Sequence, residues 1–190
     1  MYSHMMKNSE WGAVAYLTQS KYGRNGKEIA INNINSCITG NGGGSTSASS
    51  ASGTTNAYNT VKGVKASTTG NVYGIYDMSG GAYEYVAACY TGYTNELTAN
   101  TDTAYINKYI DVYESYNSPR FGDAVLETSS RSSGSTSWFS DYSNFVFSVY
   151  PVFSRGGNYG SGSGAGLFGL GNNDGNAYSY YGFRPVCVVK

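Results

Sequence analysis

Residues 155–185 read RGGNYGSGSGAGLFGLGNNDGNAYSYYGFRP, and the rest of the chain is organised around this segment. It opens with Arg155-Gly156-Gly157 and closes with Gly182-Phe183-Arg184-Pro185, and Asp174 is the one charged residue between these ends. Gly, Ser, Asn and Tyr dominate its interior, a composition typical of loops. A flexible Gly/Ser linker is one interpretation. The apolar island at 165–170 and the apolar run at 186–189 favour another, namely loops pinned at both ends to a folded core.

The residue types of this segment are those of recognition loops. Tyr supplies a large amphipathic contact area at low entropy cost, and Ser, Gly and Asn supply adaptable hydrogen bonds. We therefore expect a solvent-facing ligand-binding surface without catalytic residues, with Tyr159 either an anchor or a contact. The candidate ligand-binding residues are Asn158, Tyr159, Gly160, Ser161, Ser163, Gly169, Gly171, Asn172, Asn173, Asp174, Asn176, Tyr178, Ser179, Tyr180 and Tyr181. The fixed scaffold expected beneath them comprises Leu167, Phe168, Phe183 and Arg184.

The composition limits the classes of function. A chain of 190 residues is long enough for one domain, here 1–190, with a sizeable core. Its formal net charge is zero and 13% of its residues are charged, which argues against nucleic-acid binding. The 20 Tyr and 26 Gly are typical of extracellular or virion surfaces, so we expect a protein or glycan ligand on a cell surface.

No stretch is long and apolar enough to span a membrane, and residues 1–7 lack the features of a signal peptide. We expect no membrane insertion and a location on a phage virion or a bacterial surface. The chain is then either a piece of a longer protein or part of a particle released by lysis. The sequence leaves the oligomeric state open.

Cysteine usage leaves two alternatives open. Cys37, Cys89 and Cys187 are odd in number, so one disulfide with a free thiol and three reduced thiols are both compatible with the sequence. No CxxC spacing occurs, which argues against a zinc site. Cys187 lies in the apolar run and is expected to be a small buried residue.

The pattern along the chain predicts short elements joined by loops. A helix begins near Asn8 or Ser9 as cap, buries Trp11, Val14, Ala15 and Leu17, and ends at the turn residues 22–26. Residues 28–34 are expected to be extended, and 39–59 to be a long surface loop. Residues 71–86 suggest strand, bend and strand, and 105–116 a short helix or strand. In 138–153 the alternation of Phe145, Phe147 and Val149 predicts a strand.

Catalytic patterns are weak. His4 is the only histidine and is expected at a frayed terminus, which argues against Ser-His-Asp or Cys-His chemistry. Asp77 and Glu84 lie among aromatic residues and are either acid–base groups or, as we favour, hydrogen-bond anchors for turns. Residues 172–176 faintly resemble a calcium loop but lack the distal Glu of an EF-hand. We expect no metal and no cofactor.

Taken together, these segments resemble one family. Residues 8–11, NSEW, resemble its EW helix, and residues 73–85, YGIYDMSGGAYEY, resemble its G-L-Y-D-M-x-G-N-V-W-E-W pattern. The ends of the 155–185 segment resemble its RGGSW and GFR signatures. The family is the formylglycine-generating enzyme-like branch of the C-type lectin fold. The family's opening strands, which precede the EW helix, are not evident in this chain.

The resemblance points away from the family's enzymes. Its sulfatase-activating oxidases carry catalytic cysteines between the RGG and GFR motifs, and this chain has none between Arg155 and Arg184. The chain is more similar to the variable proteins of diversity-generating retroelements, whose RGG-to-GFR segment is the diversified ligand-binding face. The segment 165–168, AGLF, resembles the fixed part of such cassettes. An oxidase-type enzyme and a surface or tail protein without a dedicated ligand remain the alternatives.

The genetic code offers an independent check. These elements substitute template adenines, and changes at the first and second bases of AAC reach Tyr, Ser, Asp and Gly but never Lys, Glu, Gln, Met or Trp. None of those unreachable residues occurs between Gly156 and Gly182. A loop that is merely rich in Gly and Ser could show the same absence.

The resemblance implies an α+β domain of the C-type lectin fold, rich in loops and built on short antiparallel strands. Gly80, Gly156, Gly157 and Gly182 should lie at turns or at close backbone contacts. Arg155 and Arg184 should be tied to backbone carbonyls or to carboxylates such as Glu84 or Asp77.

Overall fold

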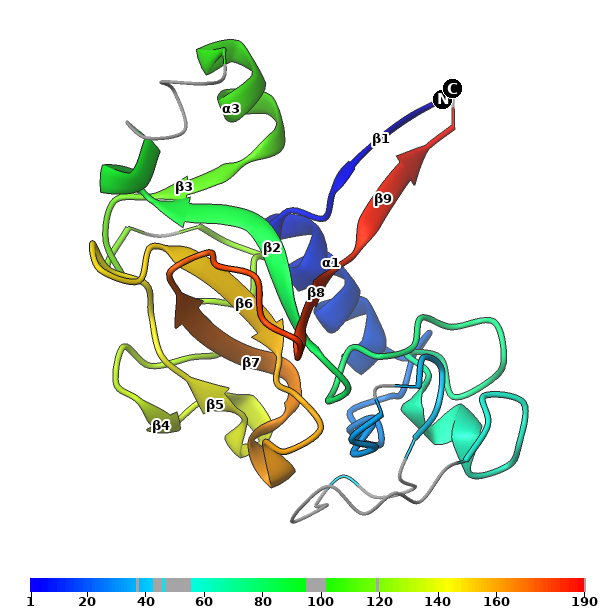
Figure 1. Cartoon of the computed structure of the whole chain (residues 1–190). Helices are drawn as coiled ribbons and strands as arrows, with labels where there is room; N and C mark the ends of the chain where they lie inside the picture. Colours follow the sequence, from blue (N-terminus) through cyan, green and yellow to red (C-terminus); the bar gives the residue numbers. More distant parts are fainter. Residues whose placement is uncertain (37, 43–45, 47–55, 95–101, 119, 190) are drawn as a thin grey trace.

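A curved sheet with one long helix packed against it forms the body of the protein (Figure 1). In this computed structural model the chain is mixed α and β, rich in short strands and in loops. The structure describes residues 1–36, 38–42, 46, 56–94, 102–118 and 120–189. The mixed α and β architecture agrees with the α+β class predicted from the sequence.

The elements are short, as the broken apolar pattern predicted. The helices are α1 (Asn8–Gln19) and α3 (Thr103–Tyr109), with 3-10 turns η1 (Gly63–Ala66), η2 (Thr91–Tyr93), η3 (Trp138–Ser140) and η4 (Gly162–Gly164). The strands are β1 (Tyr2–Met5), β2 (Tyr83–Tyr90), β3 (Asp111–Tyr113), β4 (Gly134–Ser135), β5 (Tyr142–Ser143), β6 (Val152–Gly156), β7 (Gly166–Asn173), β8 (Tyr181–Phe183) and β9 (Pro185–Val188). Among the described residues, no helix is both long enough and apolar enough to cross a membrane.

The main sheet has the order β3-β2-β6-β7-β5-β4, and β8 also pairs with the start of β2. The central pairs β2–β6 and β6–β7 are antiparallel, as predicted. The pairs β2–β3, β2–β8 and β5–β7 are parallel, which the sequence analysis did not foresee. Parallel neighbours need long connections, and here each parallel pair joins strands that are distant in the chain or separated by helix or loop.

Helix α1 differs from its prediction at both its cap and its face. The cap position is Lys7, whose backbone N–H donates to Glu10 Oε2 (2.8 Å), so neither Asn8 nor Ser9 caps the helix. Leu17 is 63% exposed, and Thr18 takes the buried position instead. The reason is periodicity, because positions 11, 15 and 18 share one face, whereas position 17 turns away from it.

The core lies between α1 and the sheet. Trp11 is fully buried, and its indole Nε1 donates to the Leu167 carbonyl (2.8 Å), which ties the helix to β7. Phe153 of β6 and Phe168 of β7 are also fully buried. Phe168 lies against Trp138, with ring centroids 5.2 Å apart, and both rings contact Tyr16 of α1, so the segment around η3 packs beside α1 on β7.

The two chain ends form a ribbon that projects from the body in Figure 1. Strand β1 pairs antiparallel with β9, Tyr2 opposite Val188, so an opening strand does precede α1, contrary to the sequence analysis. The His4 side chain is only 7% exposed and its Nε2 lies 2.9 Å from Glu10 Oε1, so His4 is not frayed. Cys187 was expected to be buried but is exposed, because it lies on the outward face of the ribbon, alternating with the half-buried Val186 and Val188.

Other segments follow or depart from the predicted pattern. Residues 28–31 run without helix or ladder, and only Asn32 makes a bridge, to Gly80. Most of the predicted loop 39–59 lies outside the described residues. The segment 105–116 holds both a helix and a strand, namely α3 and β3. The strand predicted around 145–149 is wrong, because Phe147 bridges to Tyr150 and Val149 stands exposed in the turn between them.

Candidate ligand-binding site

A buried arginine fixes the start of the 155–185 segment. Arg155 ends β6 without solvent exposure, and its Nε donates to Asn8 Oδ1 (2.7 Å). Its Nη2 donates to the carbonyls of Asp123 (2.9 Å) and Ala124 (3.1 Å). Burial lowers the pKa of Arg155 to about 10, so the group remains charged at neutral pH. The prediction that Arg155 is tied to backbone carbonyls is confirmed.

The two glycines after Arg155 turn the chain out of the core. Gly156 and Gly157 have φ of +82° and +71°, a region that L side chains rarely adopt. A Cβ at Gly157 would lie 2.8 Å from the Ala165 Cα, so the two ends of the loop between β6 and β7 meet there. The predicted turn role is therefore confirmed for these two glycines.

A second arginine fixes the end of the segment. Arg184 lies between β8 and β9, and its Nε donates to Glu84 Oε2 (2.8 Å) while its Nη2 donates to Glu84 Oε1 and to the Tyr76 carbonyl (3.0 Å). Burial raises the pKa of Glu84, and the neighbouring guanidinium opposes that rise. Asp77 accepts from Asn32 Nδ2 and Gly40 N, both at 2.9 Å. Asp77 and Glu84 therefore act as hydrogen-bond anchors, the interpretation favoured from the sequence.

Between these anchors, three strands present an outer face. On β2 the side chains of Glu84 and Val86 are buried, and those of Tyr83 and Tyr85 alternate with them on the outer side. Tyr85 pairs with Ser154 of β6, and Ser154 pairs with Gly171 of β7. Gly171 has no side chain, and a Cβ there would lie only 2.5 Å from Ser154 Oγ. The residues of this row are therefore small and leave a depression in the outer face of the sheet. Taller side chains beside this row enclose a groove.

The groove has a volume of about 410 Å³ and a neutral polar lining. Hydroxyl and amide groups supply nearly all of its polar atoms, a set suited to an uncharged polar ligand. No Asp, Glu, Lys or Arg is among the lining residues, which are Tyr83, Ser135, Tyr142, Ser154, Ser161, Ser163, Gly164, Gly171, Asn172 and Tyr181. Half of them, Ser161, Ser163, Gly171, Asn172 and Tyr181, were predicted as ligand-binding residues.

Beside the groove stands a tyrosine cluster, which we define as Tyr83, Tyr85, Tyr178, Tyr180 and Tyr181. Tyr181 is at its centre, with ring centroids 5.0 Å from Tyr83, 4.7 Å from Tyr85, 5.5 Å from Tyr178 and 5.3 Å from Tyr180. Tyr178 and Tyr180 also stack on each other and are 39% and 36% exposed. Stacked rings of this kind hold one another in place, so the cluster offers rigid contact area to a ligand.

Asn173 ties the cluster to the end of β7. The Tyr85 hydroxyl donates to Asn173 Oδ1 (2.5 Å), and Asn173 Nδ2 donates to the Tyr181 hydroxyl (2.9 Å). Burial raises the pKa of Tyr181 to about 12, so its hydroxyl stays protonated at neutral pH. Asn173 therefore holds the rings of Tyr85 and Tyr181 in place. A substitution there would break these hydrogen bonds, so Asn173 is less free to vary than a diversified position should be.

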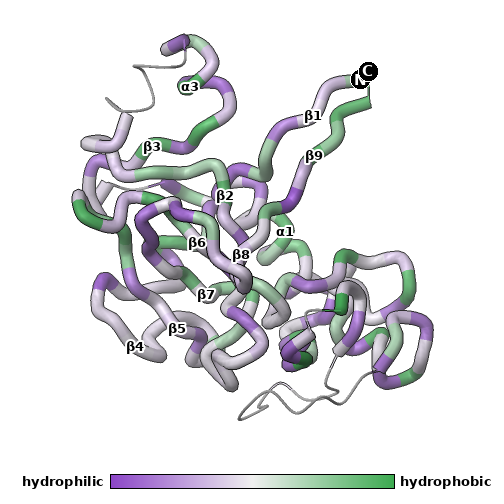
Figure 2. The backbone as a smooth tube through the Cα atoms, in the orientation of Figure 1, coloured by the Kyte–Doolittle hydropathy of each residue, from purple (hydrophilic) through white to green (hydrophobic). Residues whose placement is uncertain are grey.

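The turn between β7 and β8 is strongly hydrophilic, as Figure 2 shows. Asp174 accepts from Asn176 N (2.9 Å), Asn176 Nδ2 (2.8 Å) and the Tyr178 hydroxyl (3.1 Å). The N–H of Asn176 is the main cause that lowers the pKa of this carboxyl. Its oxygens therefore bond within the turn. Across the described ranges, no group of three or more His, Cys, Asp or Glu side chains could hold a metal ion.

The structure distributes the predicted ligand-binding residues over three classes of exposure. The exposed ones are Gly160, Ser163, Asn176, Tyr178, Ser179 and Tyr180. The half-buried ones are Asn158, Tyr159, Ser161, Gly171, Asn172, Asn173, Asp174 and Tyr181. Gly169 is buried, so its prediction as a solvent-facing position is wrong. Its carbonyl accepts from Arg155 Nη1 (3.4 Å), and a Cβ there would lie 3.0 Å from the Gly166 carbonyl oxygen.

The predicted scaffold also needs correction. Leu167 and Phe168 are buried and Arg184 is anchored, as expected. Phe183 is 66% exposed and does not face the core. Side chains alternate in direction along β8, and at position 183 the side chain points outward. Gly182 sits within β8, has no unusual φ, and has open space where a Cβ would stand, so it is not a required glycine.

Several residues of the groove and of the tyrosine cluster lie outside the 155–185 segment, and the sequence analysis did not identify them as part of the site. Tyr83 and Tyr85 complete the tyrosine cluster from β2, and Tyr142 and Ser135 line the groove from β5 and β4. The alternation Tyr83-Glu84-Tyr85 is a local signal that could have placed both rings on one face. For Tyr142 and Ser135 no local signal exists, because their position depends on the parallel pairing of β5 with β7.

Comparison with family models, curated proteins and solved structures found no match. The function is therefore inferred from the groove and the tyrosine cluster themselves.

Proposed function

We propose that this chain is a ligand-binding protein whose 155–185 segment is a diversified binding surface made by a diversity-generating retroelement. It would belong to the formylglycine-generating enzyme-like branch of the C-type lectin fold and display its surface on a phage or bacterial exterior. One observation carries the proposal, namely that the groove and tyrosine cluster are neutral, polar and aromatic, and are built mainly from that segment. These are the residue types and the geometry of a recognition surface.

The separation of variable and fixed residues supports diversification. Tyr178, Ser179 and Tyr180 are exposed, and substitutions at exposed positions usually change stability by less than about 0.5 kcal/mol. Beneath them Phe168 and Arg155 are completely buried and hold the sheet and helix together. A face of this kind can change its side chains while the fold beneath it persists.

Binding is tested by screening the protein on arrays of surface proteins and of glycans. We expect a ligand that binds the wild type and loses at least ten-fold in affinity when Tyr178→Ala and Tyr180→Ala are combined. Tyr73→Ala is the matched control, because Tyr73 is 92% exposed and lies outside the segment. Equal loss in the control, or unchanged affinity in the double variant, would place binding elsewhere.

Diversification is tested on the encoding DNA. Most codons of the exposed positions of the segment should end in a pyrimidine, usually C. A near-copy of the segment beside a reverse transcriptase gene should carry adenines at the matching places. Ordinary third bases and no near-copy would refute diversification, while the binding surface would remain.

A further inference from the structure

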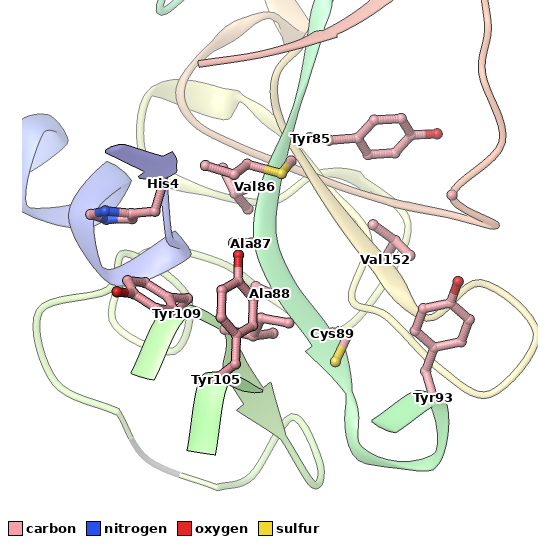
Figure 3. A pocket seen from close by; sticks show the side chains of 13 residues that line it. His4, Tyr85, Val86, Ala87, Ala88, Cys89, Tyr93, Tyr105, Tyr109 and Val152 are labelled. Atoms are coloured by element: carbon pink, nitrogen blue, oxygen red, sulfur yellow. The ribbon is translucent and has the colours of Figure 1, made fainter. Parts of the chain in front are cut away.

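A second, apolar cleft lies next to the tyrosine cluster, along β2. It is bounded by β2, α3, the end of β1 and the start of β6, and its volume is about 310 Å³. Figure 3 shows Tyr105 and Tyr109 on one side of β2, and Tyr93 and Val152 on the other. A cavity of this size is within the range of small-molecule and side-chain pockets.

The chemistry of the cleft is that of a protein interior. Val86, Ala88, Val152 and Ile110 supply aliphatic groups, and none of the lining residues is Asp, Glu, Lys or Arg. Burial raises the pKa of the Cys89 thiol to about 11, so this group is neutral and behaves as a small apolar residue. The polar side chains of the lining are His4 and four tyrosines, so a hydroxyl-rich ligand would recover only part of the hydrogen bonds that it loses to water, whereas an apolar group would gain.

The cleft is continuous with the proposed binding surface. Tyr85 lines the cleft and also contacts Tyr181, with ring centroids 4.7 Å apart. Gly175, from the turn between β7 and β8, lines the cleft as well, and a Cβ there would lie 3.2 Å from Val152 Cγ2. The Tyr85 hydroxyl, which donates to Asn173 Oδ1, also lies 2.8 Å from the Asn176 carbonyl oxygen, so that turn sits against β2. A partner seated on the tyrosine cluster therefore reaches the cleft.

We propose that the cleft receives one bulky apolar side chain of the ligand, and that the ligand is therefore a protein and not a glycan. This inference rests on the proposed function, because it extends the same binding surface. Protein interfaces concentrate their affinity in aromatic or aliphatic anchors that fill a desolvated pocket, surrounded by polar contacts. Here the cleft is the pocket, and the tyrosine cluster with its amide neighbours forms the polar surround.

The cleft alone is tested with indole, a stand-in for a tryptophan side chain, by saturation-transfer NMR and isothermal titration. Indole should bind the wild type and bind Ala87→Phe at least ten-fold more weakly, because Ala87 is half-buried on the cleft wall. Tyr73→Ala, at a residue that is 92% exposed and lines neither the cleft nor the groove, should bind indole like the wild type. Tyr105→Ala, at a wall residue that is 50% exposed, gives a second test should Ala87→Phe fail to fold, and should weaken indole at least three-fold. No binding to the wild type, or equal binding to all folded variants, overturns the inference.

The partner is then tested with whatever ligand the arrays identify. A protein ligand should lose at least ten-fold in affinity with Ala87→Phe and be displaced by indole. A glycan ligand, or a protein that binds Ala87→Phe normally, overturns this inference but leaves the proposed function standing. If indole binds and no array ligand depends on Tyr178 and Tyr180, the proposed function fails instead. Self-association of the chain that indole abolishes would make the occupant a second copy, which also overturns the inference.

Discussion

Asp141→Asn should stabilise the protein at neutral pH and flatten the dependence of its stability on pH. Asp141 is 1% exposed, its Oδ2 accepts from the Phe168 N–H (2.9 Å), and a Cβ at Gly166 would lie 2.1 Å from its carboxylate oxygens. Burial raises the pKa of this carboxyl to about 8, the nearby charge of Glu28 adds to the rise, and the Phe168 N–H opposes it. An unfolded Asp has a pKa of about 3.9.

The sign follows from the proton count. Between about pH 4 and pH 8 the folded state holds a proton on Asp141 that the unfolded state has released. The stability from this group is thus complete below pH 4 and is lost as the pH rises through 8. Each pH unit well inside that window costs about 1.4 kcal/mol, so raising the pH from 5 to 7 costs about 3 kcal/mol. Asn keeps the acceptor for Phe168 N and cannot ionise, so it avoids this loss.

The assay is urea unfolding at pH 5, 6, 7 and 8, followed by fluorescence. The lead of Asp141→Asn over the wild type should grow by about 3 kcal/mol between pH 5 and pH 7. Glu28, whose pKa burial also raises, is present in both proteins, so the difference reports Asp141 together with its charge coupling to Glu28. Asp174→Asn is the control, since the pKa of Asp174 is lowered and the group does not titrate in this range. A wild type with constant stability from pH 5 to 8, or a variant less stable at pH 8 than the wild type, would refute the reasoning.

Five further substitutions test the scaffold, each by urea unfolding. Phe168→Ala should cost about 3–5 kcal/mol because the ring is fully buried, and Phe183→Ala less than about 1 kcal/mol because the ring is 66% exposed; similar costs would contradict the core assignment. Arg155→Lys should cost about 2 kcal/mol or more, since an ammonium cannot reproduce its forked donors to Asn8 and two carbonyls, and a neutral result would contradict this. Gly157→Ala should cost about 1–3 kcal/mol through its positive φ and close contact, whereas Gly182→Ala should be nearly silent.

The ends of the 155–185 segment could be predicted from the sequence, because local signals mark them. The sequence Arg155-Gly156-Gly157 indicates a turn after a buried strand. The carboxylate partner of Arg184 is Glu84, which lies within a recognisable run of aromatic residues. The exposure of Tyr178 and Tyr180 followed from the composition of the segment, whose Gly, Ser, Asn and Tyr are typical of loops. Leu17 was wrongly predicted to be buried, because neighbouring positions of a helix point about 100° apart and the buried position is the next one, Thr18.

The rest of the site depends on contacts between distant parts of the chain, which no local pattern records. Tyr142 reaches the groove only because β5 pairs with β7, and Gly169 is buried only because Arg155 and Gly166 approach it. The alternation at 145–149 resembles a strand, yet these residues find no partner strand and form a turn instead. In each case tertiary pairing overrode the local preference.

The sequence distance spanned by the core has a consequence for folding kinetics. Arg155 bonds to Asn8 across 147 positions, and Trp11 bonds to the Leu167 carbonyl across 156, so nearly the whole chain must close before the core exists. Chains dominated by such distant contacts fold slowly, and their rate is set by topology. The rings of Tyr178 and Tyr180, by contrast, stack on each other two positions apart in the turn before β8, so their contact is local. Exchanging them should alter the unfolding rate alone, so that every version of the surface folds at the same speed.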